Sequence, residues 1–153
     1  MNRCLRVSGV VSVCSRRSFI ATVVEAEVDE QGEVHLRRIT SAVDTGIVVN
    51  PDTVVAQLEG GLIFGLTAAL YGEIIIDKGR VQQSNFNDYR MLRIDQTPKI
   101  DVHLIKSNEP PGGIGETGAN AGPPALRNAI YAATGVALRR LPIDRALIAG
   151  KKT

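Results

Sequence analysis

The chain has 153 residues, which is the length of one ordinary domain and enough to bury a hydrophobic core. Its 44% of hydrophobic and 22% of charged residues are ordinary for a globular domain. The 18 basic and 16 acidic residues leave a net charge of +2, and aromatic residues make up only 4%. These values argue against a nucleic-acid partner, which would need a basic surface and rings that stack on bases.

Residues 1–18 show no period that indicates a helix or a strand, and we leave them as an unassigned leader. This leader contains Cys4 and Cys14, which are the only cysteines. They lack partners at metal-ligand spacing, so the sequence predicts no zinc site and no iron–sulfur cluster on this chain. A disulfide between the two cysteines stays open.

No apolar run approaches the ~20 residues of a membrane span, so we expect none. The segment from Ser15 to Ile20, Ser-Arg-Arg-Ser-Phe-Ile, looks like a twin-arginine export signal. The apolar stretch after it ends at Glu25, well short of the ~7–15 residues that such a signal needs. We therefore predict a cytoplasmic protein, with the periplasm as the alternative if a partner carries it across the membrane.

The first regular elements are two predicted strands. Phe19–Val28 is rich in β-branched residues, and Val34–Val43 alternates apolar with polar side chains. The turn residues of Asp29–Gly32 lie between them, so the sequence predicts a β-hairpin.

A helix is predicted from Thr53 to Tyr71, because Asn50 and Pro51 supply the chemistry of a helix start. The helix carries an unusual set of small residues, namely Gly60, Gly61, Gly65, Ala68 and Ala69. Each interior glycine costs ~1 kcal/mol relative to alanine, so the set needs a reason. One reason is close packing against another element; the other is close packing against a cofactor.

The second half of the chain continues the alternation of strands and helices. We expect a hairpin from Glu73–Asp77 and Arg80–Ser84, a loop over 85–99, a half-buried strand at Ile100–Lys106, a helix at Pro123–Leu138 and a short helix from Pro142 to Leu147. The fold class is therefore α+β, with antiparallel hairpins and a strand packed against two main helices.

The loop Asn108–Gly118 holds two prolines, four glycines and two carboxylates. The prolines fix the path of the chain, while the glycines permit close approach of a ligand. Glu116 is therefore either a solvated residue in a glycine-rich connection or a positioned carboxylate that accepts a proton from a bound molecule. The residues alone leave both readings open.

Two motifs decide between them by resemblance. Gly112–Gly118, Gly-Gly-Ile-Gly-Glu-Thr-Gly, resembles the catalytic-glutamate loop of the molybdenum hydroxylases, the xanthine oxidase and aldehyde oxidoreductase family. Asn50–Leu66, with Asn-Pro-Asp, Gln-Leu-Glu-Gly-Gly and Gly-Leu, resembles the stretch that enters a helix beside the pterin in that family. Ser84–Tyr89 and Arg139–Ile143 resemble its isoquinoline 1-oxidoreductase-like branch. The resemblance covers roughly residues 19–148.

The resemblance implies a function. The enzyme would hydroxylate an aldehyde or an N-heteroaromatic carbon with oxygen from water, and Glu116 would be the general base. The cofactor would be molybdenum–molybdopterin, with the cytosine dinucleotide among its forms. Its contacts would be Gln57, Gly60, Gly61, Gly113 and Gly115, and no residue of this chain would bind the metal directly. Iron–sulfur clusters would lie on a partner chain.

Family large subunits are several times longer than this chain, so residues 19–150 resemble the C-terminal portion of a second molybdopterin-binding domain. We expect partners in the remainder of the large subunit, an iron–sulfur subunit and a small-molecule substrate. Alone, the chain is expected to be inactive. Two alternatives stay open: a non-catalytic remnant that packs with a full-length subunit, and an unrelated small α+β binding module. If the resemblance holds, the Glu116 loop and the start of the Gln57 helix converge on one concavity.

Overall fold

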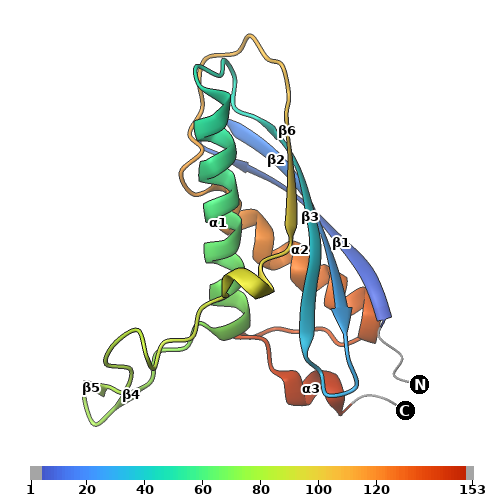
Figure 1. The fold of residues 1–153 in the computed structure, drawn as a ribbon, viewed down its shortest axis with the longest axis vertical. Coiled ribbons are helices and arrows are strands. Elements are labelled where there is room, and N and C mark those ends of the chain that lie inside the picture. The colour runs from blue at the N-terminus through green and yellow to red at the C-terminus, as the bar shows by residue number, and fades with distance from the viewer. Residues whose placement is uncertain (1–4, 151–153) are drawn as a thin grey trace.

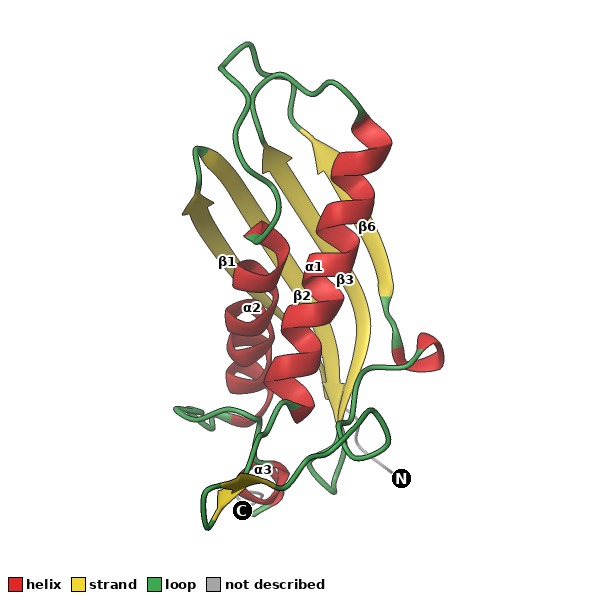
Figure 2. Ribbon diagram, turned by 90° about the vertical axis from the view of Figure 1, so that its left-hand side faces the viewer, coloured by secondary structure: helices red, strands yellow, loops and turns green. Residues whose placement is uncertain are grey.

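The computed structural model describes residues 5–150, whose main body is a four-stranded sheet with two long helices on one of its faces (Figures 1 and 2). Four strands pair in the order β1 (Leu5–Ser15), β2 (Ser18–Val28), β3 (Val34–Asp44) and β6 (Lys99–Leu104). The first three are antiparallel, while β3 and β6 are parallel. The helices are α1 (Pro51–Tyr71) and α2 (Thr117–Thr134). The α+β class is confirmed.

The predicted first hairpin is confirmed as β2 and β3. Their alternation sends one set of side chains under the helices, where Val24 and Ile39 are fully buried and lie opposite each other in the pairing. A register irregularity lies at Glu25 and Ala26. Beyond it the other face carries charged pairs, including Glu27 with Arg37 at 2.6 Å.

The unassigned leader contains a strand. Leu5–Ser15 pairs along its whole length with β2 and forms one edge of the sheet. Helix α2 lies directly on this strand at Gly9, where a Cβ would be 2.1 Å from the carbonyl oxygen of Ala125. The alternation of apolar and polar residues that marks a strand is missing at this point. The inward position is Gly9, which has no apolar side chain, and the outward position is the apolar Val10, which is 60% exposed.

Helix α1 begins as the sequence predicts. Asn50 is its N-cap, and its side-chain oxygen accepts a hydrogen bond from the backbone N–H of Thr53 at 3.3 Å. Pro51 occupies the first turn, where its missing N–H costs nothing, and Asp52 places a negative charge at the positive end of the helix. This start fixes the first turns of α1, where Gln57 lies.

The prediction for α2 was wrong at its start, because the helix begins at Thr117 and not at Pro123. Pro123 and Pro124 lie inside it, although proline removes a helical hydrogen bond. Small residues on both helices let α1 and α2 approach closely. A Cβ added at Gly118 of α2 would lie 2.7 Å from the carbonyl oxygen of Leu58, and a Cβ added at Gly65 of α1 would lie 2.6 Å from the carbonyl oxygen of Ala119. Packing against α1 thus extends the helix through a glycine-rich segment.

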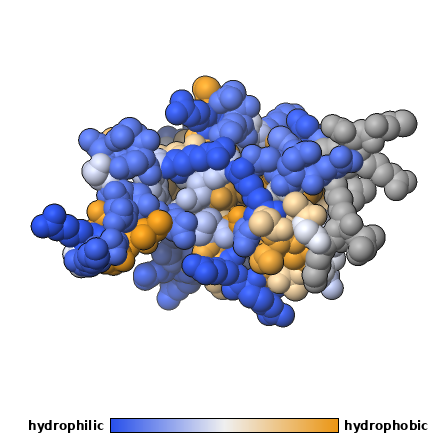
Figure 3. Space-filling view, turned by 90° about the horizontal axis from the view of Figure 1, so that it is seen from below, coloured by the Kyte–Doolittle hydropathy of each residue, from blue (hydrophilic) through white to orange (hydrophobic). Residues whose placement is uncertain are grey.

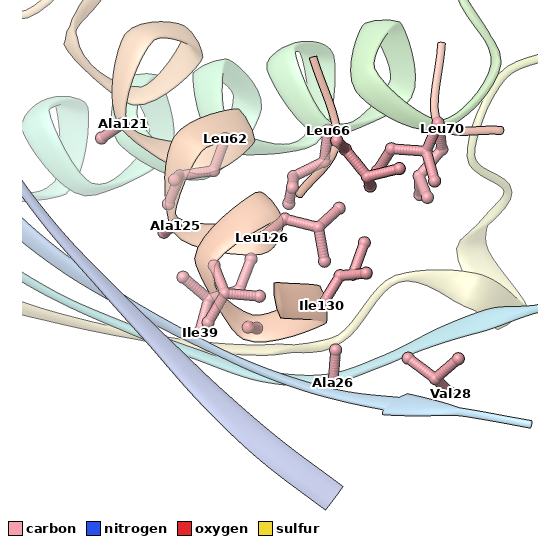
Figure 4. Packing of buried hydrophobic residues seen from close by; sticks show 14 of the residues in the cluster. Ala26, Val28, Ile39, Leu62, Leu66, Leu70, Ala121, Ala125, Leu126 and Ile130 are labelled. Carbon is pink, nitrogen blue, oxygen red and sulfur yellow. The ribbon is translucent and has the colours of Figure 1, made fainter. Parts of the chain in front are cut away.

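The core lies between this helix pair and the sheet (Figure 4). Leucines of α1 and the apolar face of α2 point toward the sheet in the close-up. The buried residues labelled there are Ala26, Val28, Ile39, Leu62, Leu66, Leu70, Ala121, Ala125, Leu126 and Ile130.

The remaining predicted elements are present but short. The second hairpin contains only β4 (Ile76–Asp77) and β5 (Arg80–Val81), on a segment that projects from the body (Figure 1). A 3-10 turn, Ile94–Gln96, leads into β6, and the last helix is α3 (Arg145–Ala149). Helix α1 has the length and composition of a membrane span, but a core helix passes the same test, and α1 packs against α2.

Candidate active site

The Glu116 loop starts where β6 ends and crosses the top of the sheet in Figure 1 beside the segment that follows β3. Backbone hydrogen bonds tie the two segments together. The N–H of Ile47 donates to the carbonyl of Glu109 at 3.0 Å, and the N–H of Gly112 donates to that of Thr45 at 2.8 Å. The glycine-rich loop is therefore held on the fold and has a defined path.

Glu116 is the N-cap residue of α2, with its carbonyl accepting a hydrogen bond from the N–H of Asn120 at 3.1 Å. Its carboxylate does not cap the helix. It accepts a hydrogen bond from the hydroxyl of Ser15 at 2.9 Å, through Oε1, and the same oxygen lies 3.8 Å from Nε of Arg16. The side chain remains 56% exposed. A carboxylate at a helix N-terminus is electrostatically favoured.

Gln57 meets the same loop. Its Nε2 donates a hydrogen bond to the carbonyl oxygen of Gly115, the residue before Glu116, at 3.1 Å. The two motifs are 58 residues apart in the chain. The two segments therefore meet as predicted, but both side chains are exposed, so within residues 5–150 they meet on an open surface and not in the predicted concavity.

The glycines near this surface divide into two groups. A Cβ added at Gly60 or at Gly115 would have no atom within 4 Å, so their bare backbone faces open space where a planar group could lie close. Gly61 faces α2 at ordinary contact distance, and Gly113 faces the side chain of Arg16 at 2.9 Å. Gln57, Gly60 and Gly115 thus present a side-chain amide and bare backbone at an exposed surface, where a flat ligand such as a pterin would have room, while Gly61 and Gly113 contact other parts of the chain.

Sequence reasoning missed Ser15 and Arg16, because both lie in the leader. The signal that could have found them is the strand pattern on either side: two β-forming runs separated by two residues indicate a hairpin turn. The structure places this turn, Ser15–Ser18, against the Glu116 loop.

No group of three metal-ligating side chains occurs within residues 5–150. Cys14 is free and exposed, and Cys4 lies outside the described residues, so their disulfide is not tested. Carboxyl groups on other parts of the surface have a lowered pKa. Hydrogen bonds from Lys99 and then Arg38 hold the pKa of Asp101 below its usual value, and backbone N–H groups of the loop Ser84–Asp88 do the same for Asp88.

Residues 12–98 match the family described as the molybdopterin cofactor-binding domain. The chain belongs to this family. It is 40% identical over 137 residues to the isoquinoline 1-oxidoreductase subunit beta of Brevundimonas diminuta, covering 89% of this chain and 18% of that protein. It is 32% identical to the putative xanthine dehydrogenase molybdenum-binding subunit of Escherichia coli (strain K12), covering 89% of this chain and 19% of that protein.

The fold agrees with this assignment. The aldehyde oxidoreductase of Desulfovibrio gigas matches with a TM-score of 0.75 and 26% identity, over 88% of this chain and 15% of that one. By their names, these relatives are oxidoreductases or subunits of oxidoreductases, and the Escherichia coli protein is a molybdenum-binding subunit. The chain spans less than a fifth of the length of each of the three.

Proposed function

We propose that this chain supplies the catalytic-base segment of a molybdenum hydroxylase that oxidises an aldehyde or an N-heteroaromatic carbon. In this reaction water provides the oxygen and a C–H bond becomes C–OH. Two protons are released, and two electrons leave to iron–sulfur clusters on a partner chain. Molybdenum–molybdopterin, in the cytosine dinucleotide or another form, supplies the oxygen-transfer and electron-accepting chemistry when bound. The remainder of the large subunit completes the binding site, and without it the chain is inactive.

Within this scheme Glu116 accepts the proton of the hydroxyl that attacks the substrate carbon. A general base must lie within hydrogen-bond reach of its proton and have little freedom. The loop satisfies the second condition, because backbone hydrogen bonds tie it to the segment after β3 and Glu116 is the N-cap residue of α2. Gln57, Gly60 and Gly115 would hold the pterin beside the base, and substrate would enter from the same open side.

One observation carries this proposal: the hydrogen bond between Gln57 and the carbonyl of Gly115. It joins the cofactor motif and the glutamate loop, so a group bound against the first turns of α1 lies next to Glu116. In the reading of an unrelated binding module, nothing would require these two segments to meet.

The test is reconstitution of the chain with the remainder of a large subunit and an iron–sulfur subunit, followed by metal analysis and turnover measurements. Glu116→Gln keeps the shape of the side chain but cannot accept the proton. General-base catalysis supplies ~10²–10⁴-fold, so we expect at least that loss with bound molybdenum unchanged. Glu109→Gln, in the same loop before the prolines, is the matched control and keeps the rate. More than about a tenth of the rate in Glu116→Gln with full metal would rule out this role.

A second candidate is a non-catalytic remnant that packs with a full-length subunit. The exposed apolar side chains favour association: Val49 is 91%, Phe86 88% and Ile94 94% exposed. Hydrophobic patches are visible between hydrophilic ones on the end of the molecule drawn in Figure 3. Such surface marks an interface, but both candidates need one. Molybdenum in the reconstituted complex at one equivalent per copy of this chain would favour the enzyme, and a metal-free chain bound to an intact subunit would favour the remnant.

A further inference from the structure

The turn between β1 and β2 has a sequence that does not suit its conformation. Arg16 and Arg17 both have positive φ, 51° and 66°. A two-residue hairpin turn with positive φ at both positions prefers Asn-Gly, because a residue with a Cβ is strained in that region. Strain of this kind persists where the surroundings hold it, and such places are often functional sites.

Here the Glu116 loop holds the turn. The N–H of Gly113 donates to the carbonyl of Arg16 at 2.9 Å. A Cβ at Gly112 would lie 2.5 Å from Oγ of Ser18 and 3.0 Å from the carbonyl of Arg17. Gly112 and Gly113 are therefore required by the turn, and the loop and the turn fit each other as one unit.

The turn also reaches the carboxylate. Ser15 Oγ donates to Oε1 of Glu116 at 2.9 Å, and Nε of Arg16 lies 3.8 Å from the same oxygen. Within residues 5–150 the structure has no hydrogen bond to Oε2 of Glu116. One oxygen of the carboxylate is thus anchored, while the other has no hydrogen bond within residues 5–150, and the side chain is 56% exposed.

We propose that Ser15 is a positioning residue, which holds the Glu116 carboxylate through Oε1 so that Oε2 is the oxygen that accepts the proton. Arg16 assists by placing its carbonyl on the loop and its guanidinium near the same oxygen. This inference rests on the proposed function. It assigns a role to the N-terminal hairpin, which lies 101 residues from the glutamate that it orients.

Two isosteric variants test it: Ser15→Thr keeps a hydroxyl, and Ser15→Val replaces that hydroxyl with a methyl group. Both suit a strand, so a difference between them reports the hydrogen bond. The matched control is Ser12→Val, at an exposed position of the same strand. The first readout is NMR of the 153-residue chain, through the nuclear Overhauser contact between residue 15 and the Glu116 methylene groups and through the Glu116 side-chain rotamer populations.

We expect Ser15→Val to lose the contact and to average the Glu116 rotamers, while Ser15→Thr and Ser12→Val keep wild-type signals. The second readout is turnover of the reconstituted complex. A misplaced catalytic group loses up to ~10²-fold, so Ser15→Val should lower kcat about tenfold or more with KM unchanged, and Ser15→Thr should restore it.

The outcomes separate the two proposals. If Glu116→Gln retains its rate, the general-base function fails, whatever Ser15 does. If Glu116→Gln loses its rate but Ser15→Val matches Ser15→Thr in both rotamer populations and kcat, the positioning role alone is overturned. Equal losses in Ser15→Thr, Ser15→Val and Ser12→Val would indicate damage to the strand and would also overturn it.

Discussion

The contact between α1 and α2 makes a sharp prediction, because three glycines of α1 differ in what an added Cβ would meet. At Gly65 a Cβ would lie 2.6 Å from the carbonyl oxygen and 2.8 Å from the Cα of Ala119. At Gly61 the nearest atoms lie at 3.4 Å, and at Gly60 there is none within 4 Å. A glycine-to-alanine substitution at each of these positions therefore adds the same methyl group in three different environments.

The magnitudes follow from these distances. Alanine favours a helix over glycine by ~1 kcal/mol, which applies at all three positions. At Gly65 the new Cβ would meet backbone atoms at 2.6 Å, so the helices must separate by about 0.8 Å to reach the 3.4 Å found at Gly61. Overpacking of this kind costs ~1–3 kcal/mol. At Gly65 the overpacking cost of ~1–3 kcal/mol less the helix gain of ~1 kcal/mol leaves a net loss, so we expect Gly65→Ala to lower the free energy of unfolding by about 1 kcal/mol, within a range of ~0–2 kcal/mol. We expect Gly60→Ala and Gly61→Ala to raise it by up to ~1 kcal/mol.

The assay is urea unfolding followed by circular dichroism, with the melting temperature as a second measurement. A difference of about 2 kcal/mol between Gly65→Ala and Gly61→Ala corresponds to about 4–8 °C in a chain of this size. Gly60→Ala controls for helix propensity alone. Equal stability of the Gly65 and Gly61 variants would refute the reasoning, since it would mean that the helices are not in backbone contact at Ala119.

Three further predictions follow from other sites. Gly9→Ala places a Cβ 2.1 Å from the Ala125 carbonyl and should destabilise by about 3 kcal/mol or more, and an unchanged urea midpoint would count against the packing of α2 on β1. Because the pKa of Asp101 is lowered in the folded chain, its ionised carboxylate stabilises the fold fully at pH values above 3.8, and this contribution is lost as pH falls through the lowered pKa. An NMR titration midpoint for Asp101 at or above 3.8 would contradict this. Glu116→Gln should lose turnover and keep molybdenum, as measured in the reconstituted complex.

The sequence predicted the elements whose signals are local. The hairpin of β2 and β3 and the start of α1 at Asn50 depend on alternation, turn residues and capping, which are visible within a few positions. The parallel pairing of β6 with β3 could not be predicted from the sequence, because the two strands are joined by a long crossover and their pairing depends on contacts far apart in the chain. The start of α2 was placed too late for a similar reason: Gly118 reads as a helix breaker unless the contact with α1 is known.

The candidate site shows the same division. Glu116 and Gln57 were found by resemblance, and the Gln57–Gly115 hydrogen bond shows that their segments meet, although on an exposed surface and not in the predicted concavity. Their roles remain predictions until turnover and metal content are measured. Ser15 was not found, because its relation to Glu116 depends on a turn whose two arginines give no turn signal and on a strand whose inward position is Gly9.

The packing of α2 on β1 has a consequence for how this chain reaches its native state. The side-chain amide of Asn128 donates to the carbonyl of Val10 at 2.9 Å, so the packing of β1 is completed by a segment that lies 118 residues further along the chain. Contacts of such sequence separation slow folding, and until they form the apolar face of the sheet is exposed to other chains. We therefore expect a nascent chain that stops before Thr117 to need protection by a chaperone or by a partner subunit.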